Sequence, residues 1–147
     1  MLHCGVALAV GADAARAGSA LDAFVPLESV VRVPLDSLAE PWRPVSFTAQ
    51  FTKSNGLDAS VPGLALRIPS GVVAFCAYCP HEFCRIDLNA NARELQCPCH
   101  GGRFDPQRGG ARLSGPPPRS TYRFKYSLSR KDLVIVGIEA ELERRLR

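Results

Sequence analysis

The chain has 147 residues, of which 46% are hydrophobic and 22% are charged. This length allows one domain with a buried core and is too short for two domains of ordinary size. The 18 basic and 14 acidic residues give a mild formal net charge of +4, and the basic residues are dispersed apart from a small group at residues 144–147, which argues against nucleic acid as a partner.

The N-terminal residues 1–27 are expected to lie outside the folded domain. Residues 4–12 are apolar, but they are far fewer than the roughly twenty residues that a transmembrane helix needs. Residues 12–23 are small and flexible in composition, which is typical of a linker. The segment is therefore interpreted either as a truncated membrane anchor with its hinge or as a flexible start.

The domain is expected over residues 28–138 as a series of short strands. Twelve prolines and twelve glycines separate runs of β-branched or alternating apolar residues, a pattern that indicates antiparallel strands joined by turns. The expected strands are residues 30–35, 44–51, 64–68, 71–78, 121–129 and 133–138, with a hairpin turn at 130–132. Strand signals fade over residues 76–118. The predicted fold class is all-β.

A short C-terminal helix is expected over residues 139–147. Ile138, Leu142 and Leu146 recur at a spacing of four residues, which would give the helix one buried stripe.

Four of the six cysteines and two of the three histidines lie in two short motifs. The motifs are CPHEFC at residues 79–84 and CPCHGG at residues 97–102. Thiolates and imidazoles are the ligands of zinc and iron–sulfur centres, and two such loops commonly surround one centre. The sequence therefore predicts a metal site built from these two loops.

A zinc site is one interpretation of the motifs. Its ligands would be Cys76, Cys79, Cys97 and either Cys99 or His100. This interpretation leaves His81 and Cys84 without a role. Cys76 also lies in an apolar run, which favours a buried packing thiol over a ligand.

A [2Fe–2S] cluster accounts for more of these residues. Two cysteines would bind one iron and two histidines the other, an asymmetric ligation that raises the reduction potential. The ligands would be Cys79, His81, Cys97 and His100. Cys84 and Cys99 then remain, one in each loop, and two loops around one small cluster bring them close enough for a disulfide. Such a bridge would stabilise the fold by roughly 3 kcal/mol in the chain-entropy picture.

Together with GPPP at residues 115–118 and VRVPLDSL at 31–38, these motifs resemble the Rieske iron–sulfur proteins, specifically the branch of cytochrome bc-type quinol oxidoreductases. The resemblance covers about residues 28–138 and implies stacked antiparallel sheets with a cluster-binding subdomain, about residues 73–118, inserted into a base subdomain. It also implies a proline loop beside the cluster, formed by Gly115, Pro116, Pro117 and Pro118. The two additional cysteines separate this branch from the Rieske domains of ring-hydroxylating dioxygenases and their ferredoxins.

The resemblance implies electron transfer at the tip of the protein. His100 is expected to meet quinol, with His81 as its companion, because reduction makes a metal-bound imidazole more basic and couples the electron to a proton. The implied partners are a cytochrome b-type membrane subunit, quinol and a c-type cytochrome acceptor, at the outer (periplasmic) face of the cytoplasmic membrane or an equivalent membrane. The alternatives are a soluble Rieske subunit of another oxidoreductase, resembling the small subunit of arsenite oxidase, and a non-redox zinc module.

Four residues depart from the pattern of the family. Gly102 and Phe104 stand where high-potential members have serine and tyrosine, whose hydroxyls donate hydrogen bonds to cluster and ligand sulfurs. Glu82 stands where leucine is usual, and Phe83 replaces a small residue. Lost donors and an added carboxylate both disfavour the reduced cluster, so we expect a potential in the lower half of the Rieske span of roughly −150 to +300 mV, suited to menaquinol rather than ubiquinol.

Overall fold

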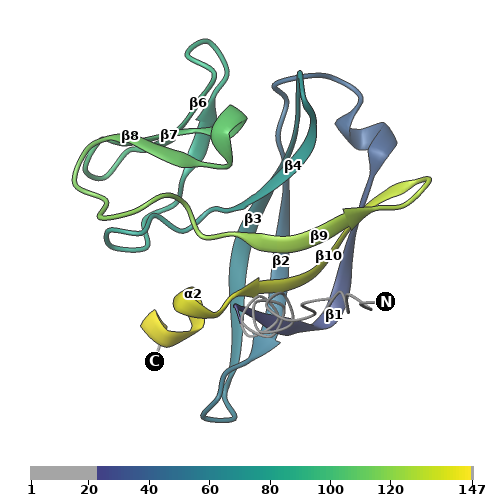
Figure 1. Ribbon diagram of the computed structural model, residues 1–147, viewed down its shortest axis with the longest axis vertical. Helices are drawn as coiled ribbons and strands as arrows, with labels where there is room; N and C mark the ends of the chain where they lie inside the picture. The colour runs from purple at the N-terminus through teal and green to yellow at the C-terminus, as the bar shows by residue number, and fades with distance from the viewer. Residues whose placement is uncertain (1–22, 147) are drawn as a thin grey trace, which may run out of the picture.

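The computed structural model describes residues 23–146, which form three antiparallel sheets (Figure 1). The strands are β1 (Phe24–Pro34), β2 (Val45–Thr52), β3 (Asp58–Ile68), β4 (Gly71–Cys76), β5 (Asp87–Asn89), β6 (Glu94–Cys97), β7 (Gly102–Asp105), β8 (Ala111–Ser114), β9 (Phe124–Leu128) and β10 (Asp132–Glu139). The helical elements are the 3-10 turns η1 (Leu35–Leu38) and η2 (Pro106–Arg108) and the helix α2 (Ala140–Arg145). The prediction of an all-β fold with one short C-terminal helix is confirmed.

Two three-stranded sheets, β1-β10-β9 and β2-β3-β4, form the base of the molecule. Alternate side chains of both sheets point into one core, in which Phe51, Tyr122, Ile135 and Leu142 are fully buried. Each such side chain stabilises the fold by about 1.5–3 kcal/mol. This core fixes where the chain leaves β4 and where it returns to β9.

The segment between β4 and β9 forms the third sheet, in the order β5-β6-β7-β8. In Figure 1 it lies to one side of the base sheets, and it has a core of its own that includes Ile86, Leu95 and Phe104. The sequence did not reveal these strands because each has only three or four residues, too few for an alternating pattern to emerge. Both cysteine–histidine motifs lie in this segment.

The expected element boundaries need correction at several points. The first strand starts before residue 28, because Phe24 and Val25 already pair with β10. The strand expected at 64–68 begins at Asp58, because its first half pairs with β2, and the strand expected at 121–129 is shortened to β9. The turn at residues 130–132 is confirmed by the hydrogen bond from the Ser129 amide to the Asp132 carbonyl.

The C-terminal helix is shorter than expected, at six residues rather than nine. Glu139 ends β10 instead of opening the helix, because its backbone still pairs with Phe24. No helix of the described part is long and apolar enough to cross a membrane. The expected anchor or hinge falls almost entirely on residues 1–22, outside the described residues.

Candidate cluster site

The first loop, residues 79–84, connects β4 to β5 and closes on itself. The Cys79 amide donates to the Cys84 carbonyl at 2.9 Å, and the Phe83 amide donates to the Cys79 carbonyl at 3.0 Å. This turn holds Phe83 at a φ of 57°, a left-handed conformation that costs a non-glycine residue roughly 1–2 kcal/mol. An edge contact with Tyr78, at 5.7 Å between ring centroids, helps to hold the Phe83 ring in place.

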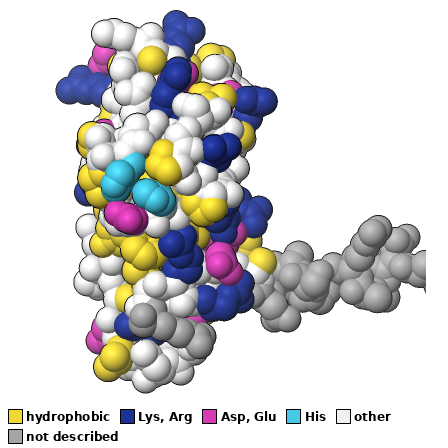
Figure 2. Space-filling model, turned by 90° about the vertical axis from the view of Figure 1, so that its left-hand side faces the viewer, with side chains coloured by type: hydrophobic (Ala, Val, Ile, Leu, Met, Phe, Trp, Pro, Cys, Tyr) yellow, Lys and Arg dark blue, Asp and Glu magenta, His cyan; other side chains and the backbone are white. Residues whose placement is uncertain are grey.

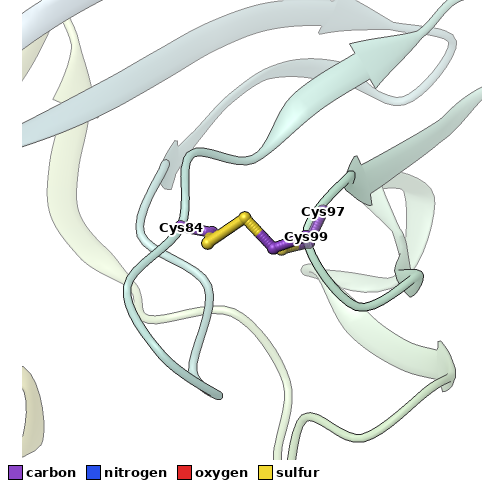
Figure 3. Close-up of side chains that lie close together, drawn as sticks. All are labelled: Cys84, Cys97 and Cys99. Carbon is purple, nitrogen blue, oxygen red and sulfur yellow. A yellow bond between two sulfur atoms is a disulfide. The ribbon is translucent and has the colours of Figure 1, made fainter.

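The second loop, residues 97–102, connects β6 to β7 and lies opposite the first. The Gly101 amide donates to the Cys97 carbonyl at 3.1 Å, which turns the chain sharply between the two strands. A disulfide between Cys84 and Cys99, the pair expected from the sequence, joins this loop to the first (Figure 3). The Cα atoms of the bridge lie 6.4 Å apart, and the Cys97 sulfur is within 4.8 Å of both of its sulfurs.

The proline loop, residues 115–118, packs backbone against backbone on the second loop. A Cβ placed on Gly115 would lie 2.8 Å from the Gly101 carbonyl oxygen, and one placed on Gly102 would lie 2.7 Å from Cγ of Pro117. Only glycine therefore fits at these two positions without movement of a neighbour. The close approach of Pro117 leaves no room for a serine side chain at position 102.

The two histidines meet across the loops, each presenting the same nitrogen to the other. Nδ1 of His81 lies 3.3 Å from Nδ1 of His100, and the rings are nearly perpendicular. Two nitrogens bound to one tetrahedral metal at about 2.0–2.1 Å lie roughly 3.3 Å apart, so this separation is compatible with two ligands on one ion. Figure 2 shows the two imidazoles side by side on the surface, with an acidic side chain against them.

The same two loops carry two buried thiols. Cys79 and Cys97 are each 1% exposed and interact with each other directly. Burial raises the pKa of the Cys79 thiol to about 11, and the neighbouring Cys97 thiol acts in the same direction, while the His81 backbone amide opposes both. Such thiols ionise when a bound cation compensates the charge, which is the behaviour of metal-ligating cysteines.

Cys76 lies apart from this pair. Its side chain belongs to the core of the base sheets, whereas Cys79 belongs to the core of the inserted sheet. Burial raises the pKa of Cys76 to about 12. Among residues 23–146, the groups that could hold a metal ion include Cys97, His81 and His100 but neither Cys76 nor Cys79. The geometry therefore favours a packing thiol and gives no support to a zinc site built on Cys76 and Cys79.

Glu82 and His100 share the exposed end of the site. A carboxylate oxygen of Glu82 lies 3.7 Å from Nε2 of His100, and the two side chains are 63% and 43% exposed. Solvent screens an ion pair at this exposure, so its contribution to stability is small. The pairing does show that the departure at position 82 places a carboxylate directly beside the outer histidine.

Sequence reasoning missed the charged and aromatic residues that support the site from the C-terminal side. Glu139 accepts hydrogen bonds from the Arg119 side chain at 2.7 Å and from the Arg123 amide at 3.0 Å. Burial alone would raise the pKa of Glu139, but these bonds and the two positive charges outweigh it and hold the pKa below its usual value. The only sequence signal was the basic group at residues 144–147, from which Arg145 reaches the first loop.

The chain belongs to the Rieske [2Fe–2S] domain family, whose family model matches residues 42–125, more than half of the chain. The cofactor of the family is a [2Fe–2S] cluster. The donor set described above fits it, since the loops offer two buried thiols and two imidazoles whose nitrogens are spaced for one iron.

The matches to individual relatives cover only part of each relative's length. A putative respiratory nitrate reductase Rieske subunit of Haloferax mediterranei is 35% identical over 66 residues, 45% of this chain and 30% of the relative. The cytochrome b6-f complex iron–sulfur subunit 1 of Synechocystis sp. is 48% identical over 40 residues, 27% of this chain and 22% of the relative. The chain thus spans less than a third of each.

Among solved structures, the chain is similar to the ferredoxin of carbazole 1,9a-dioxygenase from Nocardioides aromaticivorans. The identity is 26%, the TM-score is 0.50, and the match covers 76% of this chain and 96% of the ferredoxin. Taken together with the family match, these relatives make the chain a Rieske-type electron-transfer protein.

Proposed function

We propose that this chain accepts an electron and a proton from quinol and passes the electron to a c-type cytochrome. In this proposal Cys79 and Cys97 hold one iron of the cluster, and His81 and His100 hold the other. The observation that carries it is the 3.3 Å approach of the two Nδ1 atoms at the protein surface, in the same two loops as a pair of buried thiols. When bound, the cluster supplies one-electron chemistry at the tip.

The residues of the two loops have distinct tasks in this reaction. His100 is 43% exposed and uses Nδ1 toward His81, which leaves Nε2 at the surface to meet a quinol hydroxyl and take its proton. The thiol side is kept dry, since Cys79, Cys97 and Pro117 are all buried. The site is therefore open where a substrate must approach and closed where water would attack the metal–sulfur bonds.

The proposed partners are a cytochrome b-type membrane subunit and a c-type cytochrome. Support comes from the relative that is a cytochrome b6-f complex subunit, matched over 40 residues. The disulfide between Cys84 and Cys99 also supports placement on the outer, oxidising side of a membrane, because such bridges seldom persist in a reducing cytosol.

A second candidate function is supported by the other relative. The respiratory nitrate reductase Rieske subunit matches a longer part of this chain, 66 residues. The chain would then deliver or collect electrons as the Rieske subunit of a different oxidoreductase. The histidine tip would face a protein partner instead of a quinol pocket.

The proposed potential is low for a Rieske protein. Phe104 is completely buried and has no hydroxyl to donate, and Gly102 has no side chain. The carboxylate of Glu82 beside His100 adds negative charge at the same end. All three features disfavour the added electron, so we propose a low-potential donor, with menaquinol preferred over ubiquinol.

Isolation of the tagged full-length chain from its native membranes tests the proposed function. We expect b-type and c-type haem to co-purify, and we expect a menaquinol analogue to reduce the cluster faster than a ubiquinol analogue does. Co-purification of another oxidoreductase without b-type haem, together with no reduction by either quinol, would favour the second candidate.

A further inference from the structure

Arg145, at the end of α2, contacts the first loop although the two are far apart in the sequence. Its guanidinium donates hydrogen bonds to the Pro80 carbonyl, to the His81 carbonyl at 3.2 Å and to the Tyr122 hydroxyl at 2.8 Å. It also lies over the ring of Phe83, 5.2 Å from the centroid. Arg145 lies beyond residues 42–125, the part of the chain that the family model matches.

The two carbonyls that Arg145 binds belong to the backbone of the ligand motif. Pro80 separates Cys79 from His81, and its carbonyl needs a donor because Pro80 is buried. A guanidinium presents several donors in a rigid planar fork, which suits two neighbouring carbonyls and a hydroxyl at once. Stacking on Phe83 also restrains the residue that the loop holds at a positive φ. Arg145 thus contacts three residues of the first loop, Pro80, His81 and Phe83.

The Arg145 side chain is anchored by a connected set of groups. Tyr122 is completely buried, and the guanidinium of Arg119 lies 4.7 Å from its ring centroid. Arg119 directly follows the proline loop and pairs with Glu139 at 2.7 Å. Because Glu139 immediately precedes α2, the set ties this helix to the first loop and to the proline loop together.

The guanidinium of Arg145 has different partners from the guanidinium of Arg144. Arg144 pairs with Glu141 at 2.7 Å, whereas no carboxylate of residues 23–146 forms an ion pair with Arg145. Among these residues, the Arg145 guanidinium is bonded to the two carbonyls of the first loop and to the Tyr122 hydroxyl rather than to a carboxylate. Positive charge beside a redox centre favours its reduced form, and because Arg145 is exposed, screening by solvent keeps the effect modest.

We propose that Arg145 is a positioning residue of the cluster site, which fixes the first loop and raises the reduction potential, compensating in part for the hydroxyl donors missing at Gly102 and Phe104. This inference rests on the proposed ligand set, and it adds a determinant outside the two cysteine–histidine motifs. It predicts two separable effects of Arg145, one on loop dynamics and one on potential.

Redox titration of the full-length holoprotein tests the electrostatic part. The variant Arg145→Gln should shift the one-electron equilibrium toward the oxidised form by about threefold to tenfold, which is about 30 to 60 mV. Arg144→Gln is the matched control. It removes the same charge at the neighbouring position, from a side chain that bonds Glu141 instead of the loop. Arg145→Lys should recover most of the potential, since it keeps the charge.

Hydrogen exchange tests the positioning part. The Cys79 and Phe83 amides, which close the first loop, should exchange several-fold faster in both Arg145→Gln and Arg145→Lys than in wild type or Arg144→Gln. The measurement needs no cluster, so it also applies to the metal-free chain. A variant of Arg145 that loses its cluster faster than Arg144→Gln would likewise support the inference.

Equal midpoints and equal exchange in the glutamine variants of Arg145 and Arg144 would overturn the inference while leaving the proposed function intact. Failure of the wild-type chain to bind a [2Fe–2S] cluster would instead refute the proposed ligand set. In that case unchanged exchange in Arg145→Gln would overturn the positioning role as well.

Discussion

Replacing Gly102 by serine should strain the proline loop rather than simply restore a missing hydrogen-bond donor. The added Cβ would lie 2.7 Å from Cγ and 3.2 Å from Cδ of Pro117, and ordinary contact begins at 3.4 Å. Pro117 would have to move by about 0.7 Å, the difference between 3.4 and 2.7 Å. Overpacking of this kind costs roughly 1–3 kcal/mol.

The prediction is best tested with a double-mutant cycle on Gly102 and Pro117. Gly102→Ala should lower the free energy of unfolding by about 1–3 kcal/mol in chemical denaturation, and Pro117→Ala, which removes the obstructing ring atoms, should relieve most of that loss. The backbone at Gly102 lies outside the left-handed region, so the Cβ contact is the main penalty. Destabilisations that simply add, to within about 0.5 kcal/mol, would refute the reasoning.

The same cycle carries a redox consequence. In the relieved background, Gly102→Ser with Pro117→Ala, the serine hydroxyl can approach the sulfurs without displacing the loop. A charge-assisted hydrogen bond is worth roughly 1.5–3 kcal/mol, and 1.4 kcal/mol corresponds to about 59 mV for one electron, so the midpoint should rise by about 60 mV or more. A midpoint that stays at the wild-type value in this background would show that the missing donor does not set the potential.

The remaining predictions concern the thiols and one buried carboxylate. Cys76→Ala should cost about 1–2 kcal/mol through a small cavity and keep the cluster spectrum, whereas Cys79→Ala should lose that spectrum; the reverse result would restore the zinc interpretation. Cys84→Ser with Cys99→Ser should lower the free energy of unfolding by about 3 kcal/mol and speed cluster loss, and an unchanged rate would contradict a clamping role. The folded-state pKa of Glu139 lies below its usual 4.5, so its stabilisation is present above about pH 4.5 and fades as the pH falls through the folded value. The gap in unfolding free energy between wild type and Glu139→Gln should therefore shrink on acidification, and a constant gap from pH 7 to pH 3 would be inconsistent with this ion pair.

Much of the fold and the site could be predicted from local sequence patterns. Alternating apolar residues located the longer base strands, and the motif spacing brought out the four candidate ligands and the Cys84–Cys99 pair. The short strands β5 to β8 escaped because three or four residues cannot display a period. Contacts that depend on tertiary structure were also out of reach, such as the one between Arg145 and Pro80, which are 65 residues apart.

The close approach of the proline loop to the second loop is another contact that depends on tertiary structure. The sequence showed that Gly102 departs from the family, but only the packing of Pro117 explains why a side chain is excluded there. Likewise, the two faces of the strand ending at Cys76 decide which thiols share a core, and the C-x-x-C spacing alone does not reveal this.

The central claim is that Cys79, His81, Cys97 and His100 hold one [2Fe–2S] cluster. Its most direct test is pulsed EPR of the reduced full-length chain, with histidine labelled with ¹⁵N. The account predicts a [2Fe–2S] signal coupled to two histidine nitrogens, in keeping with the 3.3 Å separation of the two Nδ1 atoms. A [2Fe–2S] signal without histidine couplings, or a colourless zinc-bound chain without any signal, would contradict it.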